Sequence, residues 1–536
     1  MGKTMEKKKL TIGLVVLLVI VAGVGYTVFY ETPDEETEVV EEQHLVVGTT
    51  DTARTLDPAD SYDTFGSRIL KNTGNTLIGY EPGTDNLEGM IAEDWEIKED
   101  GEIYNFELRD DVTFQNGEEV TAEDVKFSIE RSRDLGGMPS SLLENVDEVE
   151  IVDDHEINIH LKEPSITFLP VMAYTVATVV PEGEYPYPEN PEEVDDDEKF
   201  TDDVMSTGPY ELVEWEPEER VVLEENEDYW GEQPHAEEVE VVVYDSSEEL
   251  KQALEDDEVD LVYRELDPME REQVREIEEI DYKDFESLSI DFLVLDVTQE
   301  PLDDERVRQA IAYAVDRDEI NQEIYRGEQT PVHSLVPEGM MAHKPVFEEQ
   351  YGTGNNVEEA RDLLEEAGYS EENPLEIELW TPEQDLRIET VETIKEQIEN
   401  TDMAEVETGV EEWDEFQERM GADIAFHIIG WEPDFYDPDN FLTPFLETDS
   451  AAFLGSHYSE EEMDQMLDEQ LQIIDYEERT EKLEEIQDKL AEDVPYIPLT
   501  QSEQFSAFQP SIDEDSVELG PVQIFRYYTI RKDHWE

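Results

Sequence analysis

Three short stretches in the second half of the chain decide the fold class. Residues 375–380 read LEIELW, residues 388–398 read IETVETIKEQI, and residues 424–431 read IAFHIIGW. Apolar side chains alternate in the first and third stretches, as in strands, and recur at helical spacing in the second. A strand, a helix and a strand in this order predict a largely parallel sheet and an α/β fold. Because ligands on such sheets bind beyond the carboxyl ends of strands, residues 430–439 are candidate ligand contacts.

Strand and helix signatures alternate through the rest of the chain. Apolar alternation predicts strands at 104–108 and 239–243, and a hairpin of 149–151 with 157–161. Four helices are predicted from the signals at their ends. Three have N-terminal signals: Thr121 with Asp124, Pro301 with Asp303 before 307–315, and Ser459 with Glu462 before 463–474. The fourth, 357–367, is predicted to end at Gly368. At about 150 residues per domain, the length suggests three or four units.

The composition is strongly acidic. The 536 residues include 146 Asp and Glu against 35 Lys and Arg, which gives a formal net charge of −111. Such a charge repels nucleic acid and anionic lipid, so neither is an expected partner. The aromatic fraction of 9% and the regular apolar spacing argue against disorder. Adaptation to high salt explains the acidity, since the Debye length falls to about 3 Å at 1 M salt. We therefore expect a salt-adapted archaeon as the source; a generically acidic protein is the alternative.

The N-terminus has the features of an export element. Lysines crowd residues 1–9, residues 10–30 carry no charge, and residues 31–44 are rich in Glu. The uncharged run is long enough to span a bilayer, and the preceding lysines predict that the body lies outside the cell. Its length favours a retained transmembrane anchor with an acidic tether, although Gly23 and Gly25 leave a cleaved signal segment open. The predicted location is the extracellular side of the plasma membrane.

Several chemistries find no support in the residues. There is no Cys, which excludes disulfides, thiolate metal sites, Cys nucleophiles and lipid attachment through Cys. The motifs of serine hydrolases and P-loop proteins are absent, and paired carboxylates carry no information at this acidity. His155 and His160 are five residues apart near a predicted hairpin and would not converge readily on a metal. We expect no catalytic residues, no metal site and no cofactor.

Six stretches, taken in order, resemble one known family. They are 55–80 with Leu56-Asp57-Pro58, 91–131 with Ala92-Glu93-Asp94-Trp95, 206–234 with Ser206-Thr207-Gly208-Pro209-Tyr210, 301–320 with Arg306-Val307-Arg308-Gln309-Ala310, 431–441 with Asp437-Pro438-Asp439, and 458–499 ending Pro495-Tyr496-Ile497-Pro498-Leu499. Over about residues 46–499 the chain resembles the extracellular substrate-binding proteins of peptide/nickel-type ABC importers. The resemblance implies a two-lobed, periplasmic-binding-protein-like α/β fold of type II, with hinge closure and an extra inserted subdomain.

The same resemblance implies a division of the chain and a set of partners. Lobe I would comprise residues 45–80, 201–290 and 499–536, the inserted subdomain 81–200, and lobe II 291–498. Closure of the lobes around a peptide would signal the loaded state to ABC permease subunits in the membrane. We expect a monomer that is a receptor and not an enzyme.

The resemblance also implies a ligand-binding residue. In peptide-binding relatives an Asp in a Trp-x-x-Asp motif pairs with the ligand ammonium group, and the matching residue here is Asp434. An ammonium group taken into a cleft needs an anion and hydrogen bonds to offset its desolvation. Trp431, Phe435 and Tyr436 are further candidate contacts, with packing as the alternative role for each. The basic residues that could receive a ligand carboxylate, none of them singled out, are Arg387, Arg419, Arg326 and His333.

The cargo and role leave alternatives open. A nickel chelate or an oligosaccharide could replace the peptide as the transported solute. A ligand sensor for a signalling partner is the rival from a different class, and a hydrolase is the third.

Overall fold

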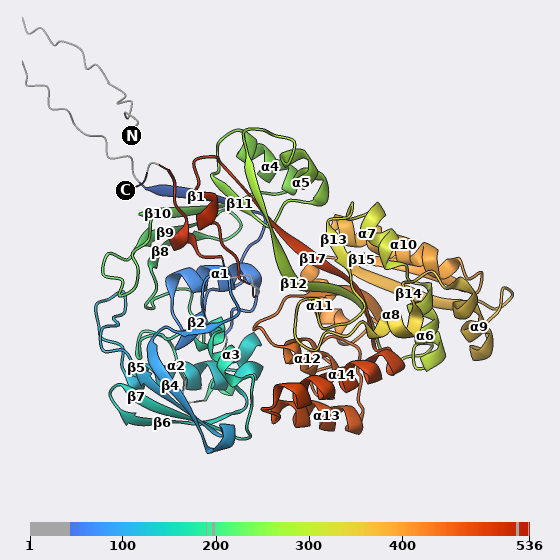
Figure 1. Ribbon diagram of the computed structural model, residues 1–536, viewed down its shortest axis with the longest axis horizontal. Helices are drawn as coiled ribbons and strands as arrows, with labels where there is room; N and C mark the ends of the chain where they lie inside the picture. The colour runs from blue at the N-terminus through green and yellow to red at the C-terminus, as the bar shows by residue number, and fades with distance from the viewer. Residues whose placement is uncertain are drawn as a thin grey trace, which may run out of the picture. The chain divides into compact units, whose positions relative to one another are not determined.

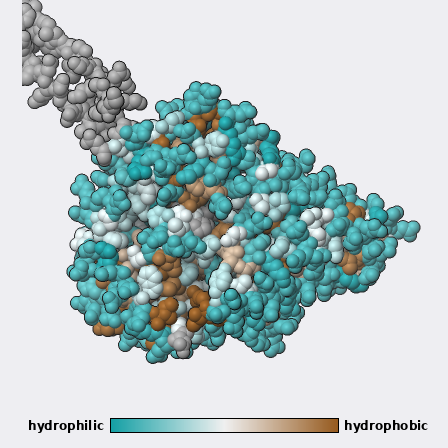
Figure 2. All heavy atoms as spheres, in the orientation of Figure 1, coloured by the Kyte–Doolittle hydropathy of each residue, from teal (hydrophilic) through white to brown (hydrophobic). Residues whose placement is uncertain are grey.

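The computed structural model describes residues 43–536 apart from 189, 196–198, 521, 523–524, 534 and 536 (Figure 1). The predicted anchor at 10–30 and all but the last two residues of the predicted tether lie outside this part. Within the described ranges, no helix is both long and apolar enough to cross a bilayer. Figure 2 shows hydrophilic side chains over most of one face, in line with the acidic composition.

One large mixed sheet runs through the described chain. In spatial order its strands are β15 (Ala404–Glu411), β14 (Leu375–Pro382), β16 (Phe426–Trp431), β12 (Asp281–Leu295), β17 (Tyr496–Phe508), β11 (Leu261–Tyr263), β1 (His44–Thr49), β10 (Glu238–Val243), β9 (Arg220–Glu225) and β8 (Tyr210–Glu216), with β13 (Gln329–Pro331) beside β17. β14 is parallel to both β15 and β16, and β1 is parallel to β10 and β11. The predicted parallel strands are confirmed, although the sequence did not reveal β15 between them in the chain.

A smaller antiparallel sheet lies in the first third of the chain. Its strands, in order, are β4 (Ala92–Lys98), β5 (Ile103–Leu108), β7 (Glu156–Leu161) and β6 (Val146–Asp153). β6 and β7 form the predicted hairpin, and β5 is the predicted strand at 104–108. A short pair, β2 (Ile78–Tyr80) and β3 (Leu87–Gly89), precedes this sheet.

Fourteen α-helices in the described residues cover the sheets. They are α1 (Thr64–Thr73), α2 (Ala122–Asp134), α3 (Phe168–Met172), α4 (Ser247–Glu255), α5 (Pro268–Val274), α6 (Glu305–Ala314), α7 (Arg317–Glu323), α8 (Val346–Tyr351), α9 (Val357–Ala367), α10 (Asp385–Glu399), α11 (Trp413–Met420), α12 (Thr443–Leu446), α13 (Glu461–Leu471) and α14 (Tyr476–Asp493).

Most helix signals in the sequence are confirmed, and two are corrected. The Asp124 carboxylate accepts from the Thr121 N–H at 3.0 Å, so α2 begins with the predicted capping box. α9 ends at Gly368, whose φ of 103° is the left-handed conformation that glycine adopts without strain. α6 begins later than expected, after Asp304. The predicted cap of α13 is wrong, because its N-cap residue is Glu460 and no side chain caps it.

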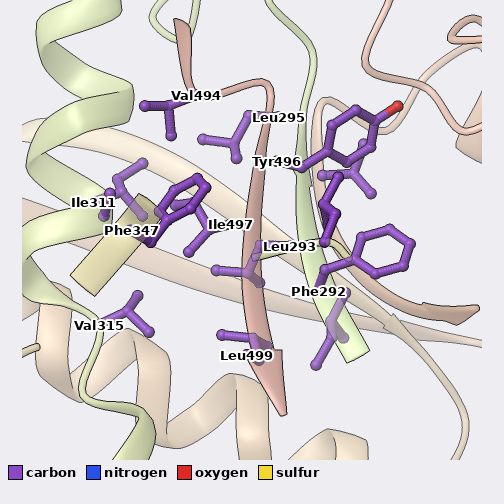
Figure 3. Close-up of a cluster of buried hydrophobic side chains, with 14 of the residues drawn as sticks. Phe292, Leu293, Leu295, Ile311, Val315, Phe347, Val494, Tyr496, Ile497 and Leu499 are labelled. Atoms are coloured by element: carbon purple, nitrogen blue, oxygen red, sulfur yellow. The ribbon is translucent and has the colours of Figure 1, made fainter. Parts of the chain in front are cut away.

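Buried apolar side chains form separate cores. The C-terminal core consists of buried residues between 288 and 499, the small-sheet core of buried residues between 77 and 179, and the N-terminal core of buried residues in 45–69, 210–263 and 508–530. Figure 3 shows part of the C-terminal core, where β12 and β17 meet apolar side chains of α6 and α8. A small cluster under α4 and α5 completes the set.

Two long paired strands connect these cores. β12 and β17 run antiparallel and side by side for most of their length (Figure 1). Their register is interrupted between Glu286 and Ile290, where residues 287–289 lie opposite Ser502 alone. Leu288 begins the C-terminal core, whereas Phe285 packs on the N-terminal core. The interruption therefore falls between two cores.

Candidate ligand-binding site

The segment after β16 bridges two cores. β16 ends at Trp431, whose ring packs edge-on against Phe445 in the C-terminal core, with ring centroids 5.4 Å apart. Four residues later, Phe435 is only 3% exposed and belongs to the small-sheet core. Asp434 thus lies at the end of a central strand, at the point where the chain passes from one core to another.

Two hydrogen bonds hold the Asp434 carboxylate. The Tyr62 hydroxyl donates to its Oδ2 at 2.8 Å, and the Asn440 amide donates to the same oxygen at 3.2 Å. Asn440 also fixes the backbone, since its Oδ1 accepts from the Asp434 N–H at 2.9 Å and from the Trp431 indole at 3.3 Å. The ring of Tyr174 stands edge-on to that of Tyr62, with centroids 6.1 Å apart. The carboxylate is therefore oriented by Tyr62 and Asn440, and Tyr174 packs against the first of these donors.

Burial dominates the electrostatics of this carboxylate. Desolvation raises the pKa of Asp434 to about 6, although hydrogen bonds from Tyr62, Asn440 and Tyr174 oppose the shift. No Lys, Arg or His of the described chain forms an ion pair with it. A desolvated carboxylate with hydrogen bonds but no cation is suited to bind a cation from outside, such as an ammonium group.

Neighbouring contacts attach the same segment to other parts of the fold. Arg264, in the left-handed region at φ 63° after β11, makes a two-contact ion pair with Glu432, one contact being 2.9 Å. The Tyr436 N–H donates to the Tyr80 hydroxyl at 3.1 Å. The segment is therefore attached to the N-terminal and small-sheet cores as well as to its own strand.

The Asp437-Pro438-Asp439 motif has a structural role. Arg479 of α14 donates to both oxygens of Asp437, at 2.7 and 2.6 Å, in a buried bidentate pair. Asp439 accepts from Gln470 of α13 and from Thr443, both at 2.5 Å. These contacts fix the residues that follow Asp434 onto the two C-terminal helices.

The structure separates the predicted contacts by environment. Asp434, Trp431 and Tyr436 are each partly exposed where the cores meet, whereas Phe435 is buried by packing. Contact of any of the four with ligand stays a prediction. Sequence reasoning missed Tyr62, Tyr174 and Asn440. The first two lie outside any periodic pattern, and only their position in space connects them to Asp434.

The basic residues that could receive a ligand carboxylate lie in different parts of the structure. Arg387 forms an ion pair with Asp291 at 2.9 Å, and a Cβ placed on Gly430 would lie 2.6 Å from the Arg387 guanidinium, so it borders the end of β16. The other three lie elsewhere: Arg419 on Glu411, Arg326 on Glu272, and His333 near Arg317. Two surface hollows lie elsewhere: one between α13 and α14, lined mostly by charged residues, and one beside α2, lined by charged and aromatic residues.

No group of three or more metal-ligating side chains occurs in the part of the chain that the structure describes. The site is an oriented, cation-free carboxylate at the carboxyl end of a central strand in a mixed α/β fold. Such a carboxylate is suited to bind a cationic group of a small solute.

Comparison with known proteins gives the family. Residues 86–453 match the model of bacterial extracellular solute-binding proteins, family 5, in its middle region, and the chain belongs to that family. The dipeptide-binding protein of Escherichia coli K12 is 27% identical over 412 residues, which cover 72% of this chain and 75% of that protein.

Solved structures confirm the predicted fold class. A dipeptide-binding protein from Pseudoalteromonas sp. SM9913, in complex with Met-Leu, has a TM-score of 0.81 and 22% identity, covering 91% of this chain and all of that one. NikZ from Campylobacter jejuni, in complex with Ni(L-His), has a TM-score of 0.79 and 20% identity, covering 92% of this chain and all of that one. The chain therefore has the periplasmic-binding-protein fold and is an extracellular solute-binding protein.

Proposed function

We propose that this protein captures peptides with a free amino end outside the cell and delivers them to the permease of an ABC importer. The observation that carries the proposal is the Asp434 carboxylate, which is partly exposed, desolvated and hydrogen-bonded, and which pairs with no cation among the described residues. The relatives named for dipeptides support a peptide over other solutes. A nickel chelate is the second candidate, because NikZ shares the fold with its bound Ni(L-His).

The chemistry of the amino end fits this carboxylate. An ammonium group that leaves water loses strong hydrogen bonds. A desolvated carboxylate replaces them with charge-assisted hydrogen bonds. The Tyr62 and Asn440 donors already orient the acceptor, so little ordering remains to be done when ligand arrives.

Closure of the two predicted lobes would be the step that signals the loaded state to the permease. The boundaries at 290/291 and 498/499 fall within β12 and β17, near the interruption at 287–289. Tyr62 and Arg264 of the proposed lobe I contact Asp434 and Glu432 of the proposed lobe II. A ligand that bridges these surfaces would favour the closed arrangement, which the permease would recognise.

The setting of the protein is part of the proposal. We place the body outside the membrane of a salt-adapted archaeon, as a monomer held by an anchor at 10–30. The uncharged run, the acidic tether and the net charge of −111 support this setting.

The test is the replacement Asp434→Asn, with affinity measured by titration calorimetry in 2 M KCl. Peptides with a free amino end should bind about 2–5 kcal/mol more weakly to the variant, as expected when one partner of a buried charge pair is removed. N-acetylated peptides should bind weakly to both proteins. Asp147→Asn, on an exposed residue of β6, is the matched control and should change nothing. Equal affinity of the wild type for free and acetylated peptides would refute the assignment.

A further inference from the structure

The interruption in the ribbon of β12 and β17 separates it into two parts. In the first part Asp284 lies opposite Phe505, and in the second part Ile290 lies opposite Gln501. Between them, residues 287–289 disrupt the ladder of backbone hydrogen bonds, which lets the ribbon bend there. Contacts that connect the two parts across the interruption therefore affect the angle between them.

An ion pair spans this interruption. The Arg264 N–H donates to the Phe505 carbonyl oxygen at 2.7 Å, which attaches Arg264 to the first part. Glu432 directly follows Trp431, which pairs with Ile290 of the second part. The Arg264 guanidinium makes two contacts with the Glu432 carboxylate, one of them 2.9 Å long. A charge-assisted contact with two hydrogen bonds therefore joins the two parts.

A second ion pair spans the same interruption. Arg275 lies over the ring of Phe505, 5.0 Å from its centroid, and its guanidinium donates to the carboxylate of Glu328. Glu328 directly precedes β13, which pairs with residues 500–502 of β17. Each of the two ion pairs thus begins at Phe505 and ends at or beyond the interruption. We call these two the cross-ribbon ion pairs.

The cross-ribbon ion pairs are more sheltered from solvent than a neighbouring pair. Their four side chains are 18–27% exposed. Arg326 and Glu272, which connect α5 to the segment before β13, are 50% and 62% exposed. Because salt screens sheltered charges less than exposed ones, the cross-ribbon ion pairs keep more of their strength in concentrated salt.

We infer that the cross-ribbon ion pairs fix the angle of the ribbon in the arrangement in which Tyr62 meets Asp434. Their link to ligand affinity rests on the proposed function. The four residues are positioning residues, because they act on the ligand through the arrangement of the lobes. A contact that favours the binding arrangement raises the affinity of every ligand of that arrangement by the same factor. The cross-ribbon ion pairs therefore set overall affinity, whereas Asp434 sets the preference for a free amino end.

The first test needs no ligand. The chain has no Cys, so spin labels can be attached specifically through Glu248→Cys on α4 and Glu365→Cys on α9, both exposed positions. Pulsed electron paramagnetic resonance in 2 M KCl then measures the distribution of distances between the labels. Glu432→Gln and Glu328→Gln should each broaden this distribution, because the ribbon gains freedom to bend. Glu272→Gln breaks the exposed pair, is the matched control, and should leave the distribution unchanged.

The second test measures affinity for dialanine, trialanine and dialanine amide by titration calorimetry in 2 M KCl. Glu432→Gln should weaken all three by the same factor of about ten, since a partly buried ion pair contributes more than an exposed pair and less than a buried one. Adding Arg264→Met to Glu432→Gln should cause no further loss, because the same interaction is already broken. Glu272→Gln should again change nothing.

The results that overturn the inference differ from those that overturn the proposed function. A distance distribution that stays the same in Glu432→Gln and Glu328→Gln overturns the role of the cross-ribbon ion pairs. A loss of affinity that differs between the three peptides, or that is multiplied when Arg264→Met is added, also overturns it. If no peptide binds to the wild type, the proposed function fails, and the label distances still decide whether the ion pairs fix the ribbon.

Discussion

At the scale of single residues, the desolvated carboxylates of this protein differ in the partners that they have. Asp57 is neutralised by a buried bidentate contact with Arg131 at 2.7 and 2.6 Å, and Asp437 by the same kind of contact with Arg479. Asp434 has only neutral donors. Asp439 also accepts from neutral donors, and burial raises its pKa, but the charge of Arg479 is close enough to oppose this shift, whereas no cation acts in this way on Asp434 among the described residues. Because an uncompensated charge is costly where it is desolvated, this difference supports the proposal that Asp434 binds a cationic group of the ligand.

The pH dependence of binding should report the ionisation of Asp434. In the ligand-free protein its pKa is about 6, and the facing Tyr62 and Tyr174 have pKa values that burial raises well above the ordinary value. Below pH 6 the carboxyl becomes protonated and loses its attraction for an ammonium group. Affinity should therefore fall about tenfold per pH unit below 6 and level off above 7.

The measurement is titration calorimetry with a peptide amide, whose amino group stays charged below pH 7 and which has no carboxylate to titrate. Asp434→Asn should give a flat profile over the same range. A wild-type affinity that does not change between pH 4.5 and 7 would contradict the expected ionisation.

At the scale of elements, glycine is required at two positions for different physical reasons. Gly368 ends α9 at φ 103°, and a Cβ added there meets nothing within 4 Å. Gly208, in the Ser206-Thr207-Gly208-Pro209-Tyr210 motif, has no left-handed φ, but an added Cβ would lie 2.2 Å from the backbone carbon of Thr73. At position 368 the left-handed backbone conformation favours glycine. At position 208 glycine is favoured because the loop lies too close to the end of α1 to leave room for a side chain.

The two substitutions should therefore differ in cost. Gly368→Ala should lower the free energy of unfolding by about 1 kcal/mol, since only backbone conformation is strained. Gly208→Ala should cost more, about 3 kcal/mol, because backbone must move to admit the methyl group. Urea unfolding of both variants in 2 M KCl measures the order, and the reverse order would contradict the close approach to Thr73.

Periodicity and caps predicted the elements, but not the contacts between them. The parallel pairing of β14 and β16 follows from apolar alternation, and the start of α2 follows from Thr121 with Asp124. β15 escaped prediction because Thr408 and Gly409 break its alternation. The Tyr62 contact joins residues 372 positions apart, and no local pattern encodes such a contact.

At the scale of the whole molecule, the net charge of −111 should make stability depend on salt. Like charges across the surface repel in dilute buffer, and the Debye length falls from about 10 Å at 0.1 M to about 3 Å at 1 M salt. The melting temperature should therefore rise steeply between 0.1 and 1 M KCl and more slowly beyond. Calorimetric or fluorescence melting curves measure this dependence.

Choline chloride at equal ionic strength is the matched control, because screening depends on ionic strength and not on the identity of the cation. It should reproduce the early part of the rise. A melting temperature that is constant or falls between 0.1 and 1 M KCl would contradict a stability limited by self-repulsion.

The interrupted register of β12 and β17 sets how this molecule can deform. Backbone hydrogen bonds keep the two strands at a fixed spacing, so the ribbon resists stretching and sliding, while the extra residues at 287–289 increase its local twist and freedom to bend. We therefore expect movement about this ribbon to be mainly torsional. Two probes attached at opposite ends of the ribbon would swing through an arc while the mid-ribbon distance stayed constant.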